Sequence, residues 1–382
     1  MHNKLFETID NLYNKYCDIW EDVCNIESHT KNKEGVDAVG KYFVEMAERR
    51  GWKTEIFPQN ISGDVVVITL NDELSSAPLS LSGHMDTVFP KGVFPTPSVR
   101  RDNENIYGPG VMDCKGGIVA AFLAMDALYE CGYKKRPVML LLQSDEENGS
   151  TSSNQKTINT ICEKAKNSVA FLNLEGIRGN TAVLERKGII RFLYKIKGKA
   201  VHSARCHTGV NAITEAAYKI IELEKMKDAD GITCNCGIIN GGTAPNTVAE
   251  ECEFTADFRF STKEELELIR KETKRISDTV FLKGCTTEVS EMSFRPSMPY
   301  SEKNYKLLEK INVILNKVSL PELTARKNPS GSDAAYATQY GIPCIDSIGT
   351  EGYNIHSVDE YSRMESLKES AKRMAASAML IE

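Results

Sequence analysis

Carboxylates and one histidine gather in three short clusters between residues 83 and 150. These clusters are residues 83–86 (GHMD), 108–117 (GPGVMDCKGG) and 144–150 (SDEENGS). The first and third follow apolar runs that predict buried strands, and the second comes just before an apolar stretch that predicts a helix. In an open parallel sheet, functional groups collect where strands end. Acidic groups at such ends indicate a site for a cation.

Two further positions extend this set. Residues 168–174 predict another strand, which ends at Glu175, and residues 342–348 predict one more, followed by a loop that reaches His356. Zinc binds imidazole nitrogen and carboxylate oxygen, and zinc sites poor in cysteine are usually catalytic. Two ions close together need a bridging carboxylate and further ligands for each ion. One set that meets this need is His84, Asp113, Glu147, Glu175 and His356.

Each of these residues also has a simpler interpretation. His84 by itself is equally well explained as a hydrogen-bonded core histidine, and most acidic triplets are solvated turns. However, Asp86 lies two residues after His84, and a metal-bound histidine usually needs such a partner on its second nitrogen. Consecutive residues at a strand end point to different sides, so Glu147 can face a metal while Glu146 faces a water molecule. An uncoordinated carboxylate beside a ligand suits a general base.

The sequence resembles metallopeptidase family M20, within it the branch of glutamate carboxypeptidase and acetylornithine deacetylase. The motifs that carry the resemblance are residues 83–88 (GHMDTV), 107–117 (YGPGVMDCKGG), 145–150 (DEENGS) and 331–333 (GSD), in family order along nearly the whole chain. The resemblance implies two Zn²⁺ ions, with Co²⁺ or Mn²⁺ as substitutes, bridged by Asp113 and a hydroxide. Relatives often have a cis peptide bond after this aspartate, which here joins Asp113 and Cys114.

The resemblance also assigns a role to each remaining residue of the set. His84 and Glu175 would complete one metal site, and Glu147 and His356 the other. Asp86 would support His84, and Glu146 would act as the general base.

Further residues match substrate-binding positions of the family. His202 matches a histidine that stabilises the oxyanion from the partner subunit of a dimer, Asn246 a substrate-contacting asparagine, and Arg259 an arginine that holds the substrate carboxylate. Surface solvation of His202 and a strand-face salt bridge of Arg259 remain as alternatives. Gly331 and Ser332 open a predicted helix, whose backbone amides are suited to holding a substrate carboxylate.

The helices and strands that must position these residues can also be predicted, and their order indicates an α/β protein of two domains. At 382 residues the chain is too long for one ordinary core. Residues 1–182 and 299–382 predict a three-layer catalytic domain with a mostly parallel sheet. Residues 183–298 change to half-buried strands with the order β-α-β-β-α-β, which predicts an inserted ferredoxin-like α+β domain. The resemblance implies that this inserted domain is a lid and a dimerisation domain.

Composition narrows the choice of partner and compartment. A net charge of −6 argues against nucleic acid or an anionic membrane surface as the main partner. Eleven cysteines without a regular framework favour free thiols, and the first residues lack an apolar signal core, so we expect a cytoplasmic protein. Cys234 and Cys236 are separated by one residue, which is not zinc-knuckle spacing.

The predicted activity is zinc-dependent amide hydrolysis without a covalent intermediate, acting on a small peptide or N-acyl amino acid. In the family, glutamate at the position of Glu175 is commoner in carboxypeptidases and deacylases than in aminopeptidases. Together with Arg259, this favours a carboxypeptidase that releases a C-terminal amino acid such as glutamate. The alternatives are an N-acyl amino acid deacylase, similar to acetylornithine deacetylase or succinyl-diaminopimelate desuccinylase, and a catalytically silent binding protein on the same fold.

Overall fold

The computed structural model describes residues 2–229 and 231–382, which form two compact units. Of these residues, the first unit comprises 2–185, 300–327 and 332–382, and the second comprises 186–229, 231–299 and 328–331. Within the described residues, no helix has both the length and the apolar character that a bilayer crossing requires.

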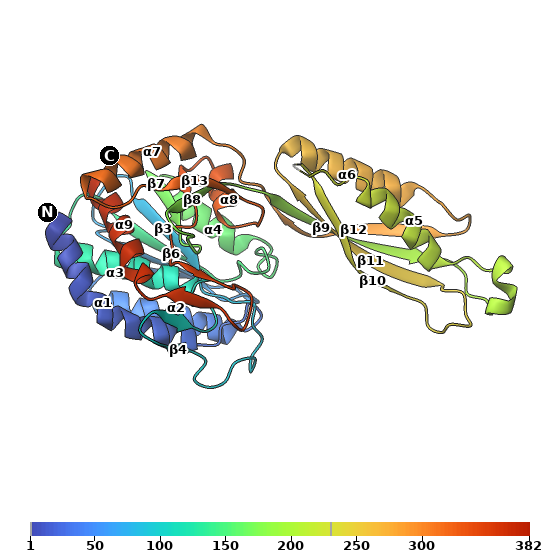
Figure 1. Cartoon of the computed structure of the whole chain (residues 1–382), viewed down its shortest axis with the longest axis horizontal. Helices are drawn as coiled ribbons and strands as arrows, with labels where there is room; N and C mark the ends of the chain where they lie inside the picture. Colours follow the sequence, from blue (N-terminus) through green and yellow to red (C-terminus); the bar gives the residue numbers. More distant parts are fainter. Residues whose placement is uncertain (1, 230) are drawn as a thin grey trace. The chain divides into compact units, whose positions relative to one another are not determined.

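A six-stranded sheet forms the centre of the first unit (Figure 1). Its strands, in spatial order, are β1 (Lys53–Phe57), β2 (Val65–Leu70), β6 (Val138–Gln143), β3 (Leu79–His84), β7 (Ala170–Asn173) and β14 (Cys344–Ile345). The pairs β6–β3, β3–β7 and β7–β14 are parallel, whereas β2 is antiparallel to both of its neighbours. The mostly parallel sheet confirms the predicted fold class.

Helices cover both faces of this sheet. They are α1 (His2–Asn25), α2 (Lys33–Glu48), α3 (Lys115–Glu130), α4 (Lys156–Ala165), α7 (Glu302–Lys317), α8 (Ala334–Gln339) and α9 (Ser366–Leu380). Val138, Leu140 and Leu142 of β6 join the large core with α3, while Met139 and Leu141 point to the other face, where α4 and α8 pack. Because both faces are covered, β2, β3 and β6 are buried along their whole length, as the apolar sequences of β2 and β6 predict.

The helix α3 is the central element of the core. Residues 115–128 of this helix are all buried, and α1 and α9, from opposite ends of the chain, pack side by side against it (Figure 1). Its first turn lies against the end of β7, where a Cβ on Gly117 would be 2.2 Å from the carbonyl oxygen of Leu174. This close approach brings Asp113, just before α3, next to Glu175, just after β7.

Short strands that the apolar pattern did not indicate form two small sheets in the first unit. One pairs β8 (Thr181–Arg186) with β13 (Thr324–Asn328), and the other contains β4 (Arg100–Arg101), β5 (Asn105–Tyr107), β15 (Gly352–Tyr353) and β16 (Tyr361–Arg363). The pairing of β16 with β5 joins segments about 250 residues apart in sequence. The strands of the second of these sheets have two or three residues each, too few to show an alternating pattern.

The second unit has the predicted ferredoxin-like order. Its elements are β9 (Gly188–Lys197), the 3₁₀ turn η1 (Ser203–Thr208), α5 (Ala212–Glu224), β10 (Thr233–Gly241), β11 (Glu251–Phe260), α6 (Lys263–Asp278) and β12 (Thr286–Arg295). The four strands form an antiparallel sheet in the order β10-β11-β9-β12, and α5 and α6 lie together along one of its faces (Figure 1). Burial alternates along β9 and β11, as expected for a sheet that is covered on one side.

Candidate metal centre

The five predicted ligands converge in the first unit, around the two carboxylate oxygens of Asp113. Oδ1 of Asp113 lies 3.0 Å from Nε2 of His84, and Oδ2 lies 3.1 Å from Nε2 of His356. Glu175 Oε1 is 3.6 Å from Nε2 of His84, and Glu147 Oε2 is 3.1 Å from Nε2 of His356. Asp113 therefore has one oxygen in each of two groups of ligand atoms.

These separations fit a metal ion in each group. Donor atoms about 2 Å from one tetrahedral zinc ion lie roughly 3.4 Å from each other. The contacts of His84 with Asp113 and Glu175, and those of His356 with Asp113 and Glu147, span 3.0 to 3.6 Å. Nitrogen and carboxylate oxygen are also the donor types that zinc, cobalt and manganese accept. The donor set could therefore hold two ions with Asp113 between them.

Asp86 holds several parts of this centre in place. The Nδ1 atom of His84 lies 3.0 Å from the carbonyl oxygen of Asp86 and 3.4 Å from its Oδ1, which leaves Nε2 for a metal. The same carboxylate accepts the backbone N–H groups of Glu146 and Glu147, both at 3.1 Å, and the hydroxyl of Thr30 at 2.6 Å. One fully buried carboxylate thus aligns a histidine and both glutamates.

The three consecutive acids at residues 145–147 lie in three different environments. Asp145 accepts hydrogen bonds from the Thr157 hydroxyl at 2.6 Å and the Ser153 backbone at 2.9 Å, so it organises the turn before α4. Glu147 faces His356, as described above. Glu146 is buried, with an oxygen within 4.8 Å of ligand atoms of His84 and Glu175. A buried carboxylate this close to the ligand atoms could accept a proton from a water molecule bound among them.

The ionisable groups of the centre shift one another's pKa values. Burial alone would raise the pKa of Asp113, but hydrogen bonds from His356 and His84 hold that pKa below its ordinary value. Hydrogen bonds to Asp113 and Glu147 raise the pKa of His356 to about 11. Burial and the charge of Asp113 raise the pKa of Glu147 to about 8. Without a metal, Asp113 therefore stays ionised, and the protons of the centre reside on His356 and Glu147.

The loop that carries His356 has an uncommon backbone conformation. His356 has a φ of +62° and Asn354 a φ of +60°, in the left-handed region that non-glycine residues seldom adopt. Such conformations persist where the surrounding structure enforces them, and they concentrate at functional sites. Here the conformation brings the ring of His356 onto Asp113 and Glu147. The peptide bond between Asp113 and Cys114 is cis, as the resemblance implied.

Glu360 is a residue of this centre that the sequence motifs did not indicate. Its buried carboxylate accepts the backbone N–H groups of Gly110, Met112 and Asp113 at 2.9 to 3.1 Å. Burial and the nearby charge of Asp113 raise the pKa of Glu360 to about 7. Glu360 is thus a positioning residue for the loop that presents Asp113. No motif surrounds it in the sequence, and only the strand pairing next to it brings it here.

The predicted substrate residues lie mostly in the second unit. His202 and Asn246 are neighbours, since residue 202 bridges Thr247 and the N–H of Ser203 donates to the carbonyl of Asn246 at 2.9 Å. Both side chains are exposed. Arg259 lies on β11, where its Nε donates to Asp257 at 2.9 Å. The salt bridge considered for Arg259 is therefore present, and it occupies one edge of the guanidinium group.

Gly331 and Ser332 precede α8, a helix of six residues. The carbonyl of Gly331 accepts from Arg186 at 3.2 Å. The hydroxyl of Ser332 is fully buried and accepts from the Asn173 amide at 2.9 Å. The substrate-binding role of these two residues stays a prediction.

Comparison with known proteins agrees with this geometry. Residues 80–380 match the model of peptidase family M20/M25/M40. The chain belongs to this family. It is 28% identical to carboxypeptidase G2 from a Pseudomonas species, over 88% of this chain and 82% of that one. It is 26% identical to succinyl-diaminopimelate desuccinylase from Nitrosospira multiformis, over 77% of this chain and 80% of that one.

Solved structures share the fold of this family member. A tripeptidase from Staphylococcus aureus superposes with a TM-score of 0.79 at 20% identity, covering 96% of this chain and 98% of the other. The family match and its hydrolase relatives confirm that the chain is a metallohydrolase.

Proposed function

We propose that this protein is a two-zinc carboxypeptidase that releases a C-terminal amino acid, such as glutamate, from a peptidyl or N-acyl precursor. The proposal of two bound zinc ions rests on the position of Asp113, which has one oxygen toward His84 and the other toward His356. The similarity to carboxypeptidase G2 supports the choice of a carboxypeptidase.

The protein's own residues would perform the proton transfers. Two bound ions would lower the pKa of a water molecule and polarise the scissile carbonyl. Glu146 would accept the proton of the attacking water and deliver it to the leaving nitrogen. Asp86 keeps Glu146 and His84 aligned through the contacts at 3.0 and 3.1 Å described above. Arg259 would hold the carboxylate of the released amino acid through its remaining N–H groups.

A second candidate activity is N-acyl amino acid deacylation. The similarity to a succinyl-diaminopimelate desuccinylase over most of both chains favours it. Both activities cleave an amide and leave a free amino acid, so they differ in the acyl group and the side chain that are recognised. A panel of peptidyl-glutamates, N-acetyl amino acids and N-succinyl amino acids, tested with the zinc-loaded enzyme, separates them through kcat/KM.

We further propose that the second unit is a lid that also forms a homodimer, in which His202 serves the partner's site. The register of β11 on β9 supports this. Arg259 pairs with Ile189 at one end, and Glu251 pairs with Lys197 at the other, just before the segment that leads to His202. Eight residues at about 3.3 Å each separate these ends by roughly 26 Å. One small substrate can contact both groups only if they come from different subunits.

The eleven cysteines, all free in the structure, suit the reducing cytoplasm as the proposed compartment.

A further inference from the structure

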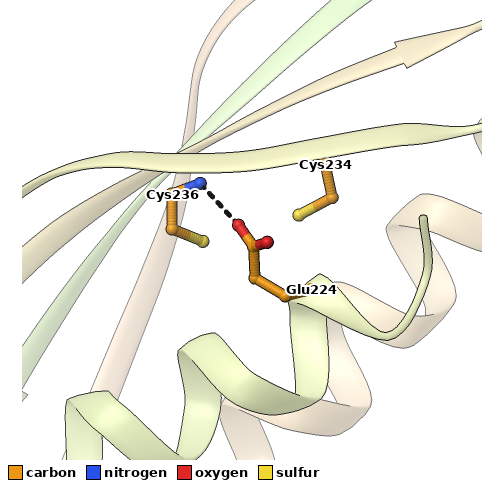
Figure 2. Close-up of side chains that lie close together, drawn as sticks. All are labelled: Glu224, Cys234 and Cys236. Carbon is orange, nitrogen blue, oxygen red and sulfur yellow. Dashed lines mark hydrogen bonds between the residues drawn. The ribbon is translucent and has the colours of Figure 1, made fainter.

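Two thiols and a carboxylate gather in the second unit, among residues that take no part in the metal centre described above. Cys234 and Cys236 lie on β10, and Glu224 is the last residue of α5. One ligand atom of each residue lies within 4.8 Å of the other two. Figure 2 shows both sulfur atoms and the carboxylate in the space between the strand and the helix.

Local structure brings these three groups together. Residues two apart on a strand point to the same face, so both cysteines face α5. The register of β10 against β11 shifts between Asn235 and Ile238, which places Cys236 in an irregular part of this edge strand. The backbone N–H of Cys236 donates to Oε1 of Glu224 at 3.0 Å (Figure 2). This bond fixes the carboxylate above the two thiols.

The two thiols of the cluster differ in how readily they lose a proton. A hydrogen bond with Cys234 lowers the pKa of Cys236 against the effect of burial, and the ammonium group of Lys227 lowers it further. Lys227 also forms an ion pair with Oε2 of Glu224. The same hydrogen bond and burial raise the pKa of Cys234, so Cys236 is the thiol of the pair that loses its proton first. Burial also raises the pKa of Cys252 on the neighbouring strand, which is not part of the cluster. Thiolate is the form of cysteine that binds metals.

The donor set selects a particular class of ligand. Thiolate sulfur favours zinc and softer ions over magnesium or calcium. Two thiolates and one carboxylate oxygen provide three of the four positions of a tetrahedral ion and leave the fourth to water. Three negative ligands and a divalent cation leave one negative charge, which Lys227 offsets. We propose that Cys234, Cys236 and Glu224 form a binding site for a thiophilic divalent cation such as Zn²⁺, independent of the proposed hydrolytic function.

Such an ion would connect the end of α5 to the edge strand β10. The hydrogen bond from Cys236 to Glu224 and the ion pair of Glu224 with Lys227 already hold this corner of the second unit. A metal bridge would replace a weak thiol contact with bonds from both sulfur atoms.

Cobalt is a suitable probe, because Co²⁺ bound to thiolate has a sulfur-to-metal charge-transfer absorption that Co²⁺ bound to histidine and carboxylate lacks. Metal-free, fully reduced protein is titrated with Co²⁺ under anaerobic conditions. We expect the charge-transfer band in the natural protein and its loss in Cys234→Ser and in Cys236→Ser. Glu224→Gln should retain the band but bind Co²⁺ at least roughly tenfold more weakly.

Two further variants control for other thiols. Cys252→Ser removes a buried cysteine from the same sheet and should leave the band unchanged. Cys114→Ser tests the thiol adjacent to Asp113 and should also leave it unchanged. Amide hydrolysis by the zinc-loaded Cys234→Ser, Cys236→Ser and Glu224→Gln proteins shows that they are folded. Absence of the band in the reduced natural protein, its survival in Cys234→Ser, or its loss only in Cys114→Ser would overturn the proposal.

Discussion

At the scale of single residues, the candidate metal centre contains carboxylates that look equivalent in the sequence but make different contacts in the structure. Asp86, Asp145 and Glu146 are all buried acids at strand ends, yet their contacts differ. Asp86 binds the backbone N–H groups of the two glutamates, and Asp145 binds Thr157 and Ser153. Glu146 lies beside the ligand atoms. The chemistry of each acid is therefore set by its partners, which substitutions can test one at a time.

The roles of Glu146 and Glu147 can be separated by matched substitutions. Glu146→Gln should bind zinc normally but lose at least ~10²-fold in kcat, because only the proton acceptor is removed. Glu147→Gln should instead lower the zinc content, because it removes a partner of His356. Elemental analysis and steady-state kinetics measure both effects. If the two effects were exchanged, the assignments of base and ligand would be reversed.

Metal binding should release protons from the centre. In the metal-free protein, the pKa of His356 is raised to about 11, so its imidazole is protonated near neutral pH. A metal requires neutral imidazole, and zinc must displace this proton. Affinity should therefore rise with pH up to about pH 11. Calorimetry in two buffers with different ionisation enthalpies measures the release, which should be smaller for His356→Gln. Equal proton release by both proteins would contradict the assignment.

Recognition of the substrate carboxylate can be tested at Arg259. Substrates with an amidated C-terminus should react poorly, because charge-assisted hydrogen bonds to the guanidinium group are lost. Arg259→Lys should raise KM, because lysine lacks the planar arrangement of donors. Arg191→Lys is a matched control, since Arg191 contacts the same Asp257 from β9 at 2.6 Å. Equal kcat/KM for free and amidated substrates would remove Arg259 from the site.

At the scale of elements, strand pairing far from the motifs supports the bridging ligand. The pairing of β16 with β5 places Glu360, just before β16, next to the loop that follows β5. The carbonyl of Glu360 accepts from Gly108 at 3.1 Å, and its carboxylate accepts from Gly110, Met112 and Asp113. Two short strands thus fix the backbone on which Asp113 is held.

Removal of Glu360 tests this support. Glu360→Ala should leave three buried N–H groups without their acceptor, at a cost of about 1–3 kcal/mol for each group that water does not reach. We expect a lower Tm and roughly 10- to 100-fold weaker zinc binding. Thermal unfolding with and without zinc, together with competition against a chromophoric chelator, provides the measurement. Glu365→Ala, a largely exposed carboxylate five residues further on, is the control and should change neither value.

At the scale of the whole molecule, the proposed homodimer is the feature on which activity depends most. All five predicted ligands lie in the first unit, whereas His202, Asn246 and Arg259 lie in the second. The roughly 26 Å between the two ends of the β9–β11 pair favours a site that is shared between subunits. A two-fold dimer would supply His202 to each site from the other chain.

Complementation tests the shared site. His202→Ala should cost about 3 kcal/mol of transition-state stabilisation, as for the loss of one oxyanion donor. An inactive Glu146→Gln subunit, exchanged with an inactive His202→Ala subunit, should form a mixed dimer with one working site. Recovery of activity is measured after exchange has been shown with differently tagged chains. A lack of recovery despite exchange, or a fully active monomer, would contradict the proposal.

The sequence by itself indicated candidate ligand residues, and it determined the two kinds of sheet and the family. Buried parallel strands and half-buried antiparallel strands leave different apolar patterns, and His84, Asp113, Glu147 and Glu175 follow or precede such strongly patterned elements. These signals are local, so they can be detected without the fold. The list of candidate ligands could therefore be drawn up from the sequence.

Only the tertiary structure decided how the residues of that list face one another. The two oxygens of Asp113 reach different histidines because α3 packs closely on the end of β7 and the loop between β15 and β16 brings His356 to Asp113. Glu360 and the cluster of Glu224 with Cys234 and Cys236 depend on the pairing of β16 with β5 and the packing of α5 on β10. Contacts between distant segments leave no periodic trace in either segment, and for that reason the sequence did not show them.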